Sequence, residues 1–142
     1  MAAVAVGRLA AALVLPAVGE GVVRARLAER IVAAGRASPT LVHPTALIAP
    51  TASLAAGVVV FAGCVVSVDT VLEAHVHLNL GCTVSHDSVL EAGVTLAPGV
   101  RVCGNVRIGR GAWLGAGAVV INGRPGRPLV VGAGALVAAR AC

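Results

Sequence analysis

The sequence of 142 residues has almost no aromatic side chains and no lysine. Phe61 and Trp113 are its only phenyl or indole side chains, it has no tyrosine, and all 11 basic residues are arginine. We therefore expect neither a conventional core anchored by large aromatic residues nor nucleic-acid binding, because no rings that could stack on bases are interleaved with the arginines. Yet 58% of the residues are hydrophobic, which excludes intrinsic disorder. A core of methyl groups and small side chains has to be built from thin, repeated layers.

The four cysteines lack any spacing typical of a metal or redox site. Cys64, Cys82, Cys103 and Cys142 form no C-x-x-C pair, so neither a zinc knuckle nor a redox pair is predicted. Residues 1–19 loosely resemble a secretory signal peptide, but no basic segment precedes the apolar run and no clear cleavage site follows it. We therefore expect a cytoplasmic protein with free thiols.

Formal charge is missing from the whole of residues 44–68. Hydropathy alone would predict a membrane span there. A hydrophobic period of six, however, continues through this segment and through the charged segments on either side. A transmembrane helix has no reason to keep that period, so we expect no membrane span.

The charges that are present are unevenly distributed along the chain. Residues 1–40 carry a net charge of +3, residues 41–87 a net charge of −3, and residues 88–142 a net charge of +5. The basic final part indicates either a site for an anionic ligand or an ordinary solvated surface, and the charge pattern alone fits both.

A hydrophobic period of six governs residues 42–120. Every sixth position is aliphatic: Val42, Ile48, Leu54, Val60, Val66, Leu72, Leu78, Val84, Leu90, Leu96, Val102, Ile108, Leu114 and Val120. The position four places later in each hexad is small or β-branched. We expect the aliphatic side chain to point inward and the small one to lie where the chain turns a corner. The phase slips once, within residues 122–128, which are rich in turn formers.

Such a period is typical of a solenoid whose stacked coils share one continuous core. The pattern resembles the hexapeptide-repeat family, whose fold is a left-handed parallel β-helix with three hexads in each coil. The resemblance covers about residues 41–137 and predicts an all-β solenoid domain over residues 41–142, with between four and five coils. Cys64 and Cys82, which are three hexads apart, are then expected to stack on adjacent coils, both buried.

Residues 1–40 do not keep this period. Residues 12–18 are expected to form a buried strand, residues 22–34 an amphipathic helix, and Gly35 to end that helix. One strand and one helix are a fragment of an α/β unit, so we interpret residues 1–40 as a truncated α/β domain. The expected packed face of the helix comprises Val23, Leu27, Ile31 and Ala34, with Arg24, Arg26, Glu29 and Arg30 elsewhere.

Polar residues interrupt the repeat most clearly in the segment Val-Ser-His-Asp at residues 84–87. Positions three hexads apart stack on neighbouring coils, so His86 is expected to lie between Val68 and Gly104. Gly104 leaves space beside the imidazole and offers an accessible backbone N–H. A histidine titrates near neutral pH, so this placement suits a general base. An ordinary surface histidine at a corner of the coil would have the same spacing.

Residues 77–120 resemble one branch of these acyltransferases, the sialic acid O-acetyltransferases and nucleotide-sugar 4-amino N-acetyltransferases. Residues 41–46 resemble the start of that branch's β-helix, and residues 18–21 with Arg24 resemble the end of its N-terminal sugar-nucleotide domain. The matching features are Asn79, His86-Asp87, Pro98-Gly99, Gly104-Asn105-Val106 and Ile108-Gly109.

The resemblance implies an acetyl-CoA-dependent transferase that acts on an amino sugar, a nucleotide sugar or sialic acid. It implies that His86 removes a proton from the acceptor amine or hydroxyl, and that Asp87 orients the ring and stabilises its protonated form. It also implies that the Gly104 N–H holds the thioester oxygen as negative charge develops there. Asn79 matches a residue expected to contact the acceptor.

The same resemblance implies where acetyl-CoA is held and how the chains assemble. Gly104, Gly115, Ala116, Gly132 and Gly134 are expected to pass close to the pantetheine arm, where larger side chains would obstruct it. A homotrimer is expected, with each site between neighbouring β-helices. Candidates for the CoA phosphates are Arg101, Arg107, Arg110, Arg124 and Arg127.

The sequence departs from the family at two points. Thr95 stands where the family often has a second histidine, and the N-terminal domain is short. Two other functions stay open: a non-catalytic or truncated β-helix scaffold, and a metal enzyme similar to γ-class carbonic anhydrases. The second would need His75, His77 and His86 as ligands, although their spacing does not match that family. The sequence specifies neither the acceptor nor whether the product is an amide or an ester.

Overall fold

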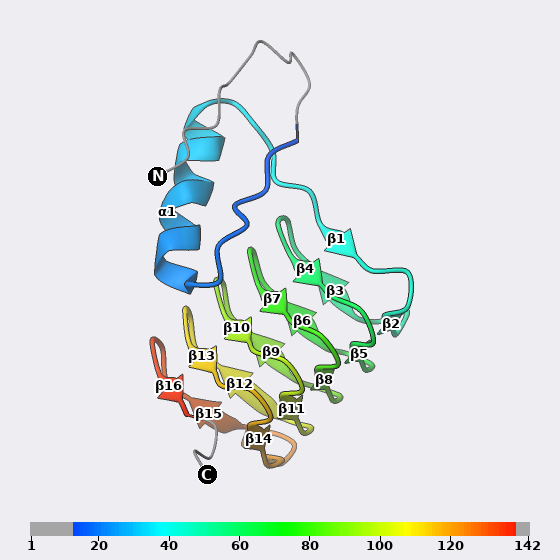
Figure 1. Ribbon diagram of the computed structural model, residues 1–142. Coiled ribbons are helices and arrows are strands. Elements are labelled where there is room, and N and C mark those ends of the chain that lie inside the picture. The colour runs from blue at the N-terminus through cyan, green and yellow to red at the C-terminus, as the bar shows by residue number, and fades with distance from the viewer. Residues whose placement is uncertain (1–12, 139–142) are drawn as a thin grey trace.

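The computed structural model, which describes residues 13–138, shows a parallel β-helix beside a single α-helix (Figure 1). Short strands form the three sides of the coils, and turns form the edges between them. Sheet A contains β1 (Leu41–Val42), β4 (Val59–Val60), β7 (His77–Leu78), β10 (Thr95–Leu96), β13 (Trp113–Leu114) and β16 (Leu136–Val137). Sheet B contains β2 (Leu47–Ile48), β5 (Val65–Val66), β8 (Thr83–Val84), β11 (Arg101–Val102) and β14 (Val119–Val120). Sheet C contains β3 (Ser53–Leu54), β6 (Val71–Leu72), β9 (Val89–Leu90), β12 (Val106–Ile108) and β15 (Leu129–Val131).

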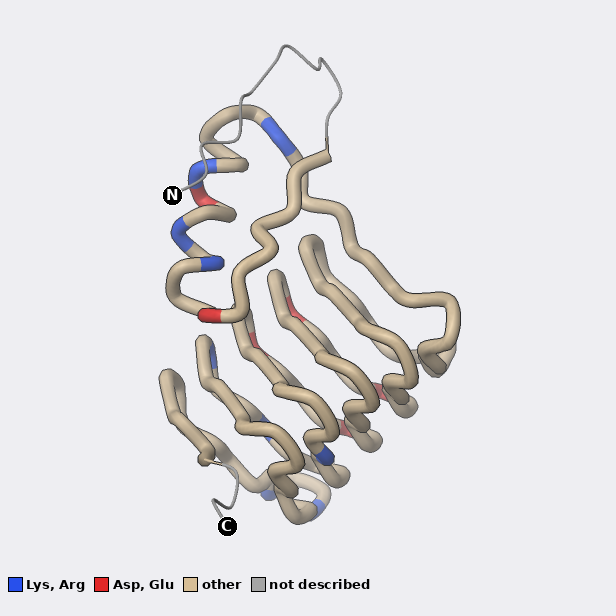
Figure 2. Tube along the Cα trace, in the orientation of Figure 1, with Lys and Arg blue, Asp and Glu red and all other residues tan. Residues whose placement is uncertain are grey.

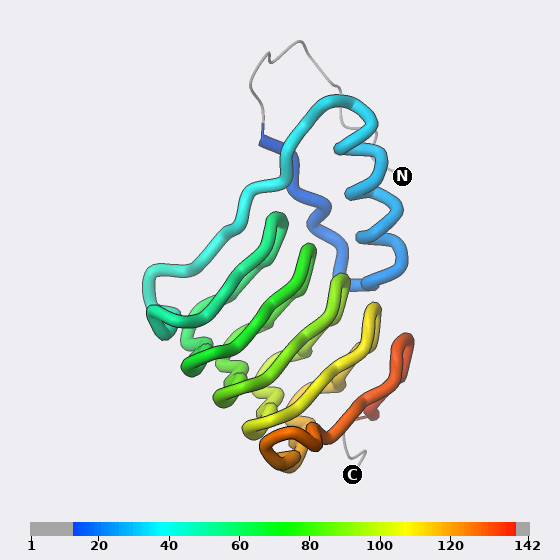
Figure 3. The backbone as a smooth tube through the Cα atoms, turned by 180° about the vertical axis from the view of Figure 1, so that it is seen from behind, coloured from blue at the N-terminus to red at the C-terminus, as the bar shows by residue number. Residues whose placement is uncertain are grey.

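The coils stack in a constant register through most of the chain. In sheet A, Val60 pairs with Leu78 and Leu78 with Leu96, so each residue pairs with the equivalent position three hexads later. All ladders are parallel, and the view from behind shows the coils lying one below another (Figure 3). The predicted β-helix is therefore confirmed, and residues 44–68 lie in its first coils rather than in a membrane span.

The interior of the β-helix is the expected column of aliphatic side chains. Every sixth residue from Val60 to Leu114 is buried, as predicted. Ile48 and Leu54 are only partly buried because their coil has a described neighbour on one side only. The corner positions carry the small or β-branched side chains that the turns can hold, and these complete the same core.

Cys64 and Cys82 occupy two of these corner positions on adjacent coils. Both are buried and free, as predicted, and each thiol donates to a carbonyl oxygen: Cys64 Sγ to Asn79 O at 2.9 Å and Cys82 Sγ to Ala97 O at 3.1 Å. A hydrogen bond with Cys64 and burial raise the pKa of the Cys82 thiol. Cys142 lies outside the described residues.

The predicted slip in the repeat is a loop at one edge of the β-helix. Ile108 pairs with Val131 rather than with the position three hexads later, so the last coil is longer than the others by five positions. The extra residues lie in the turn between β14 and β15, where Arg124 and Arg127 exchange backbone hydrogen bonds of 3.1 and 2.9 Å. The sheets continue in register beyond the loop because the extra residues are confined to this turn.

The N-terminal part differs from the prediction in one element. Residues 13–18 form no strand, and the part of the expected strand at residue 12 lies outside the described residues. Val14 N donates to Ala37 O at 3.2 Å, but none of the described strands pairs with this segment, and Pro16 has no N–H for a ladder. The helix is confirmed: α1 spans Gly21–Ala33 and ends before Gly35, whose φ of 66° is left-handed.

The face that α1 presents to the β-helix also differs from the prediction. Gly21, Arg24 and Ala28 are its buried residues, whereas Val23, Leu27 and Ile31 are only partly buried and Ala34 is exposed. A Cβ at Gly21 would collide with the Gly93 carbonyl oxygen, so the first turn of the helix touches the backbone of the β-helix. The helix therefore packs through small residues and one arginine rather than through an aliphatic stripe.

Arg24 is fully buried, which corrects the prediction that it lies away from the packed face of the helix. Its guanidinium donates to His75 O at 2.9 Å, Gly93 O at 2.8 Å and Thr95 Oγ1 at 2.9 Å. The same side chain donates to the carbonyls of residues 18 and 19 at 2.8 and 3.0 Å. Burial lowers its pKa to about 10, so it keeps its charge at neutral pH. One cation thus joins the N-terminal segment to two coils of the β-helix.

The docked segment covers outward-facing residues of sheet A. His77 and Thr95 point outward on this sheet, yet they are only 7% and 2% exposed. Thr95 Oγ1 donates to Gly19 O at 2.9 Å. Within the described residues, His77 Nε2 and the buried Nδ1 of His75 have no hydrogen-bond partner. Burial, followed by the nearby Arg24 charge and then His75, lowers the pKa of His77 to about 4.

Charged residues are sparse on the β-helix and dense on α1 (Figure 2).

In residues 13–138, no helix has both the length and the apolar character needed to cross a bilayer. The predicted signal-like segment falls largely outside the described residues.

We expect Arg24→Met to weaken docking of the N-terminal segment. The substitution leaves the carbonyls of His75, Gly93 and the 18–19 turn without their donor, so the free energy of unfolding should fall by roughly 2–4 kcal/mol. Urea denaturation measures this loss, and limited trypsin digestion reports exposure of α1. Arg26→Met, on the exposed side of the same helix, is the control. Equal effects of the two variants would contradict the anchoring role of Arg24.

Acid should destabilise the protein through His77. Its folded-state pKa is about 4, and an unfolded histidine titrates at about 6.5. The unfolded chain therefore binds more protons between these values, and stability should fall as pH drops from about 6.5 to about 4, by up to about 3 kcal/mol. Denaturation at a series of pH values should show a shallower decline for His77→Leu, whereas His43→Ala, at an exposed site, should behave like the parent protein.

Candidate functional site

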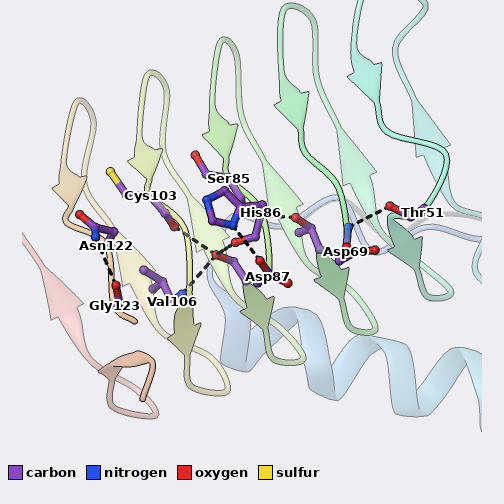
Figure 4. Close-up of polar contacts among 11 residues, drawn as sticks. Thr51, Asp69, Ser85, His86, Asp87, Cys103, Val106, Asn122 and Gly123 are labelled. Atoms are coloured by element: carbon purple, nitrogen blue, oxygen red, sulfur yellow. Dashed lines mark hydrogen bonds and ion pairs between the residues drawn. The ribbon is translucent and has the colours of Figure 1, made fainter. Parts of the chain in front are cut away.

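The candidate site lies on the edge where sheet B turns into sheet C, which we call the BC edge. It consists of the corner segments 67–70, 85–88, 103–105 and 121–128 (Figure 4). Because corners stack at intervals of three hexads, His86 and Gly104 occupy equivalent corners of adjacent coils. Asn105 N donates to His86 O at 3.0 Å, which joins the two corners directly.

His86 and Asp87 form a pair at the surface of this edge. His86 Nδ1 lies 2.8 Å from Asp87 Oδ2, and the side chains of both residues are 54% exposed. Asp87 has a φ of 55°, a left-handed conformation that aspartate tolerates better than most residues with a Cβ. Asp87 thus adopts the backbone conformation that the turn needs, and its carboxylate bonds to Nδ1 of His86. Nε2 of His86 is then left for another partner.

The free ring nitrogen lies over Gly104. A Cβ added to Gly104 would be 2.5 Å from His86 Nε2 and 2.6 Å from Cε1. Only a residue without a side chain can occupy this corner while the imidazole keeps its place. The predicted space beside the histidine is therefore present, and the ring itself occupies part of it.

The Gly104 amide is an available donor. Among the described residues, no acceptor bonds to it, whereas the amides at the equivalent hexad positions of Ala92 and Arg110 donate to carboxylates. Ala92 N bonds to Glu73 Oε2 at 3.0 Å, and Arg110 N bonds to Glu91 Oε2 at 2.9 Å. This backbone position therefore binds a negatively charged oxygen at two other corners of the same β-helix.

The electrostatic effect of such an amide is visible at Glu91. The Arg110 N–H, followed by the Arg107 side chain, holds the pKa of Glu91 below its ordinary value. An amide at this hexad position thus stabilises a negative charge on oxygen. Gly104 presents the same donor beside His86, with no carboxylate to occupy it.

The structure places the other predicted contacts on different edges of the prism. Asn79, Gly115 and Ala116 lie on the edge between sheets A and B, and Asn79 Nδ2 already donates to Leu96 O at 2.8 Å. Gly132 and Gly134 lie on the edge between sheets C and A. Of the small residues predicted to line the pantetheine arm, only Gly104 shares the BC edge with His86. A single chain therefore does not bring the predicted cofactor and acceptor residues together.

The five candidate arginines are also dispersed. Arg101 points outward on sheet B, and Arg110 lies at the edge between sheets C and A. Arg107 is paired with Glu91, its Nη2 lying 2.7 Å from Oε1. Arg124 and Arg127 are exposed on the loop of the BC edge, one coil beyond Gly104, where Gly123 N donates to Gly104 O at 3.0 Å.

The histidines needed for a metal enzyme are not gathered in this chain. His75 and His77 lie beside the docked N-terminal segment, whereas His86 lies on the BC edge. Within residues 13–138, no three His, Cys, Asp or Glu side chains are placed to hold a metal ion together. Thr95, which departs from the resembled pattern, is buried by the N-terminal segment.

Sequence reasoning missed the hydrogen bonds that fix this edge. The six-residue period places Ser88 at a corner position for small or β-branched residues and gives it no further role, yet it is fully buried and contacts both the His86 coil and the Gly104 coil. A hydroxyl in a column of mostly apolar corner residues was the available signal. Its partners include backbone atoms of the next coil, which a search for side-chain motifs does not reveal.

Comparisons with known proteins agree with the repeat and the fold. No protein-family model matches the sequence. The GDP-perosamine N-acetyltransferase of Escherichia coli O157:H7 is 32% identical over 118 residues, which cover 83% of this chain and 53% of the relative. The acetyltransferase domain of PglB from Neisseria gonorrhoeae FA1090 is 36% identical with a TM-score of 0.81, over 87% of this chain and 58% of that one.

Two related crystal structures contain ligands. The same PglB domain has been solved in complex with acetyl coenzyme A, with 34% identity and a TM-score of 0.73 over 86% of this chain and 62% of that one. PerB from Caulobacter crescentus, solved with CoA and GDP-perosamine, is 28% identical with a TM-score of 0.66, over 87% of this chain and 65% of that one. The chain spans little more than half the length of the curated relative that it matches. The hexad repeat and the β-helix make this chain a hexapeptide-repeat protein, and it is similar to these acetyltransferases over more than four fifths of its own length.

Proposed function

We propose that this chain is an acetyl-CoA-dependent N-acetyltransferase that acts on a nucleotide-linked amino sugar. The observation that carries the proposal is the His86–Asp87 pair beside the free amide of Gly104. A base and an oxyanion donor on adjacent coils are the two groups that acyl transfer to an amine requires.

In this proposal each group has a role. His86 accepts a proton from the acceptor amine as the amine nitrogen bonds to the thioester carbonyl carbon. The Gly104 N–H donates to the carbonyl oxygen, which takes up the electron pair of the C=O bond. When the C–S bond breaks, the imidazolium returns a proton to the departing thiolate. Asp87 stabilises the imidazolium between these two transfers through its 2.8 Å contact with Nδ1.

The names of the relatives support an amino sugar as acceptor. The E. coli relative is named a GDP-perosamine N-acetyltransferase, and PerB was crystallised with GDP-perosamine. We therefore favour an amine on a nucleotide sugar over the hydroxyl of sialic acid. Asn79 contacts this acceptor in our proposal through its side-chain oxygen, because its amide nitrogen already bonds to Leu96 O.

The dispersion of the predicted residues supports a homotrimer. Gly115 and Ala116 lie on a different edge from His86, and so do Gly132 and Gly134. They can line the site of His86 only when a second prism packs beside the first. Exposed apolar side chains on and beside sheet B, including Leu47, Val65 and Leu80, offer a surface for that packing.

The basic loop on the BC edge supports a place for the CoA phosphates. Arg124 and Arg127 are exposed one coil beyond Gly104, and their backbones pair with each other to shape the loop. We assign them to the phosphates ahead of Arg107, whose guanidinium is already paired with Glu91. A protein that uses acetyl-CoA would work in the cytoplasm, where thiols such as Cys64 stay reduced.

A thiol-release assay tests the proposed function. The protein is incubated with acetyl-CoA and a panel of acceptors: nucleotide-linked amino sugars, free amino sugars and sialic acid. Release of free CoA with an amino-sugar nucleotide, together with an amide product by mass spectrometry, is the expected result. Release of CoA with sialic acid alone would indicate that the acceptor group is a hydroxyl and not an amine. No release with any acceptor would favour a non-catalytic scaffold, and zinc-dependent activity would favour the metal enzyme.

Replacing the base should abolish most of the activity without unfolding the protein. His86→Ala should lower kcat by about 10²–10⁴-fold, and thermal stability should change little because this side chain is half exposed. Asp87→Asn should cost less, since it removes only the charge that stabilises the imidazolium. His43→Ala, at an exposed corner, is the control. A normal rate for His86→Ala would exclude it as the base.

Adding a methyl group at Gly104 should displace the His86 ring. The new Cβ would overlap the imidazole nitrogen, so we expect shifted His86 ring resonances by NMR and a loss of acetyl transfer. Gly132→Ala is the matched control for the ring signals, because a Cβ there would have no heavy atom within 4 Å. Unchanged His86 resonances in Gly104→Ala would contradict the observed contact.

A further inference from the structure

Ser88 is a buried hydroxyl that the proposed reaction does not yet use. It follows Asp87 directly and has no exposed surface. Its Oγ lies 3.1 Å from Cys103 O and 3.3 Å from His86 O, and it accepts from Val106 N at 3.2 Å. Cys103 and Val106 flank the Gly104–Asn105 turn (Figure 4). One hydroxyl therefore contacts both ends of the turn that carries the oxyanion donor, and the carbonyl of the base.

The Gly104 turn lacks a local hydrogen bond that the turns at the other two edges have, so it depends more on the contact with Ser88. At equivalent hexad positions on those edges, the amide closes its own turn by donating to the carbonyl three positions earlier. Ala112 N bonds to Gly109 O at 3.1 Å, and Ala118 N bonds to Gly115 O at 3.0 Å. The Val106 amide instead donates to Ser88 Oγ on the neighbouring coil. At the Gly104 turn, the hydrogen bond of the equivalent amide therefore joins two neighbouring coils, that of Gly104 and that of His86, and does not close a single turn.

We propose that Ser88 is a positioning residue for acetyl transfer, holding the Gly104 amide in register with the His86 ring. The proposal rests on the function proposed above. Because Gly104 has no side chain and its turn lacks the local hydrogen bond, Ser88 and the Asn105–His86 bond set the direction of its N–H. An oxyanion donor acts only when it is aimed at the developing charge, so a small rotation of this turn lowers the rate.

Thr70 provides a matched control one coil earlier. It occupies the same hexad position on the BC edge, is equally buried, and donates from Oγ1 to Ser85 O at 3.2 Å. Its hydroxyl makes no contact with the Gly104 turn. Thr70 also shows that a β-branched hydroxyl residue fits this corner, so Ser88→Thr is the conservative variant that keeps the hydroxyl.

The first measurement is amide hydrogen exchange by NMR. In the parent protein the Val106 amide should be protected by Ser88 Oγ. Ser88→Ala should accelerate exchange at Val106, whereas Thr70→Ala should not and Ser88→Thr should restore protection. Unchanged protection of Val106 in Ser88→Ala would overturn the proposed clamp, whatever the activity.

The second measurement is steady-state kinetics of the same variants. Ser88→Ala should lower kcat by roughly 10- to 100-fold, with little change in the KM for acetyl-CoA, because the substrate-binding surface is untouched. The midpoint of the acidic limb of the pH profile should stay in place, since His86 and Asp87 are retained. Ser88→Thr should recover most of kcat. An equal loss in Thr70→Ala would show a general stability effect and overturn the proposal.

The two proposals fail in different ways. A parent protein with no more activity than His86→Ala would refute the proposed function, and the role of Ser88 with it. If the parent protein is active and Ser88→Ala has the same kcat, the positioning role alone is refuted and the acetyltransferase proposal stands.

Discussion

The parallel stacking of coils at intervals of three hexads is the constraint on which this molecule depends. It fixes which side chains face inward, which corners adjoin, and which backbone groups meet. An isolated coil would leave its aliphatic side chains in water and its strand edges unpaired, so stability comes from contact between neighbours. The candidate site follows from the same rule, because His86 and Gly104 are neighbours only through the ladder. No loop closure or domain movement is needed to bring them together.

The N-terminal segment is held by polar contacts rather than by an apolar face. The guanidinium of Arg24 donates hydrogen bonds to carbonyl oxygens of the segment itself and of the edge of the β-helix. A β-helix edge is rich in such carbonyls because every corner turns some of them outward. Fully buried, the cation has no water to replace these partners, which makes the contact specific in direction. Burial, followed by the charge of this cation, lowers the pKa of the adjacent His75 and His77.

The sequence predicted the features that follow from the six-residue repeat, and it missed the contacts of the N-terminal segment that packs against the β-helix. The interior column, the corner cysteines, the loop at residues 122–128 and the adjacency of His86 and Gly104 all follow from one period. The strand predicted at residues 12–18 was wrong over its described part, residues 13–18, because that part pairs with no described strand. Arg24 was misplaced because its acceptors include the carbonyls of residues 75 and 93, far along the chain. Ser88 was overlooked because its partners include backbone atoms of another coil, which no side-chain pattern records.

The loop at residues 122–128 shows how this architecture can change length. The extra residues of the last coil are absorbed at one corner, and the next strands still pair in register. A whole added coil before residue 68 would likewise lengthen the prism and leave the histidine facing its glycine. An added coil between residues 86 and 104 would instead separate them by one layer. The geometry of the candidate site therefore does not depend on the total number of layers, but it would be lost if a layer were added within the single coil that runs from the histidine to the glycine.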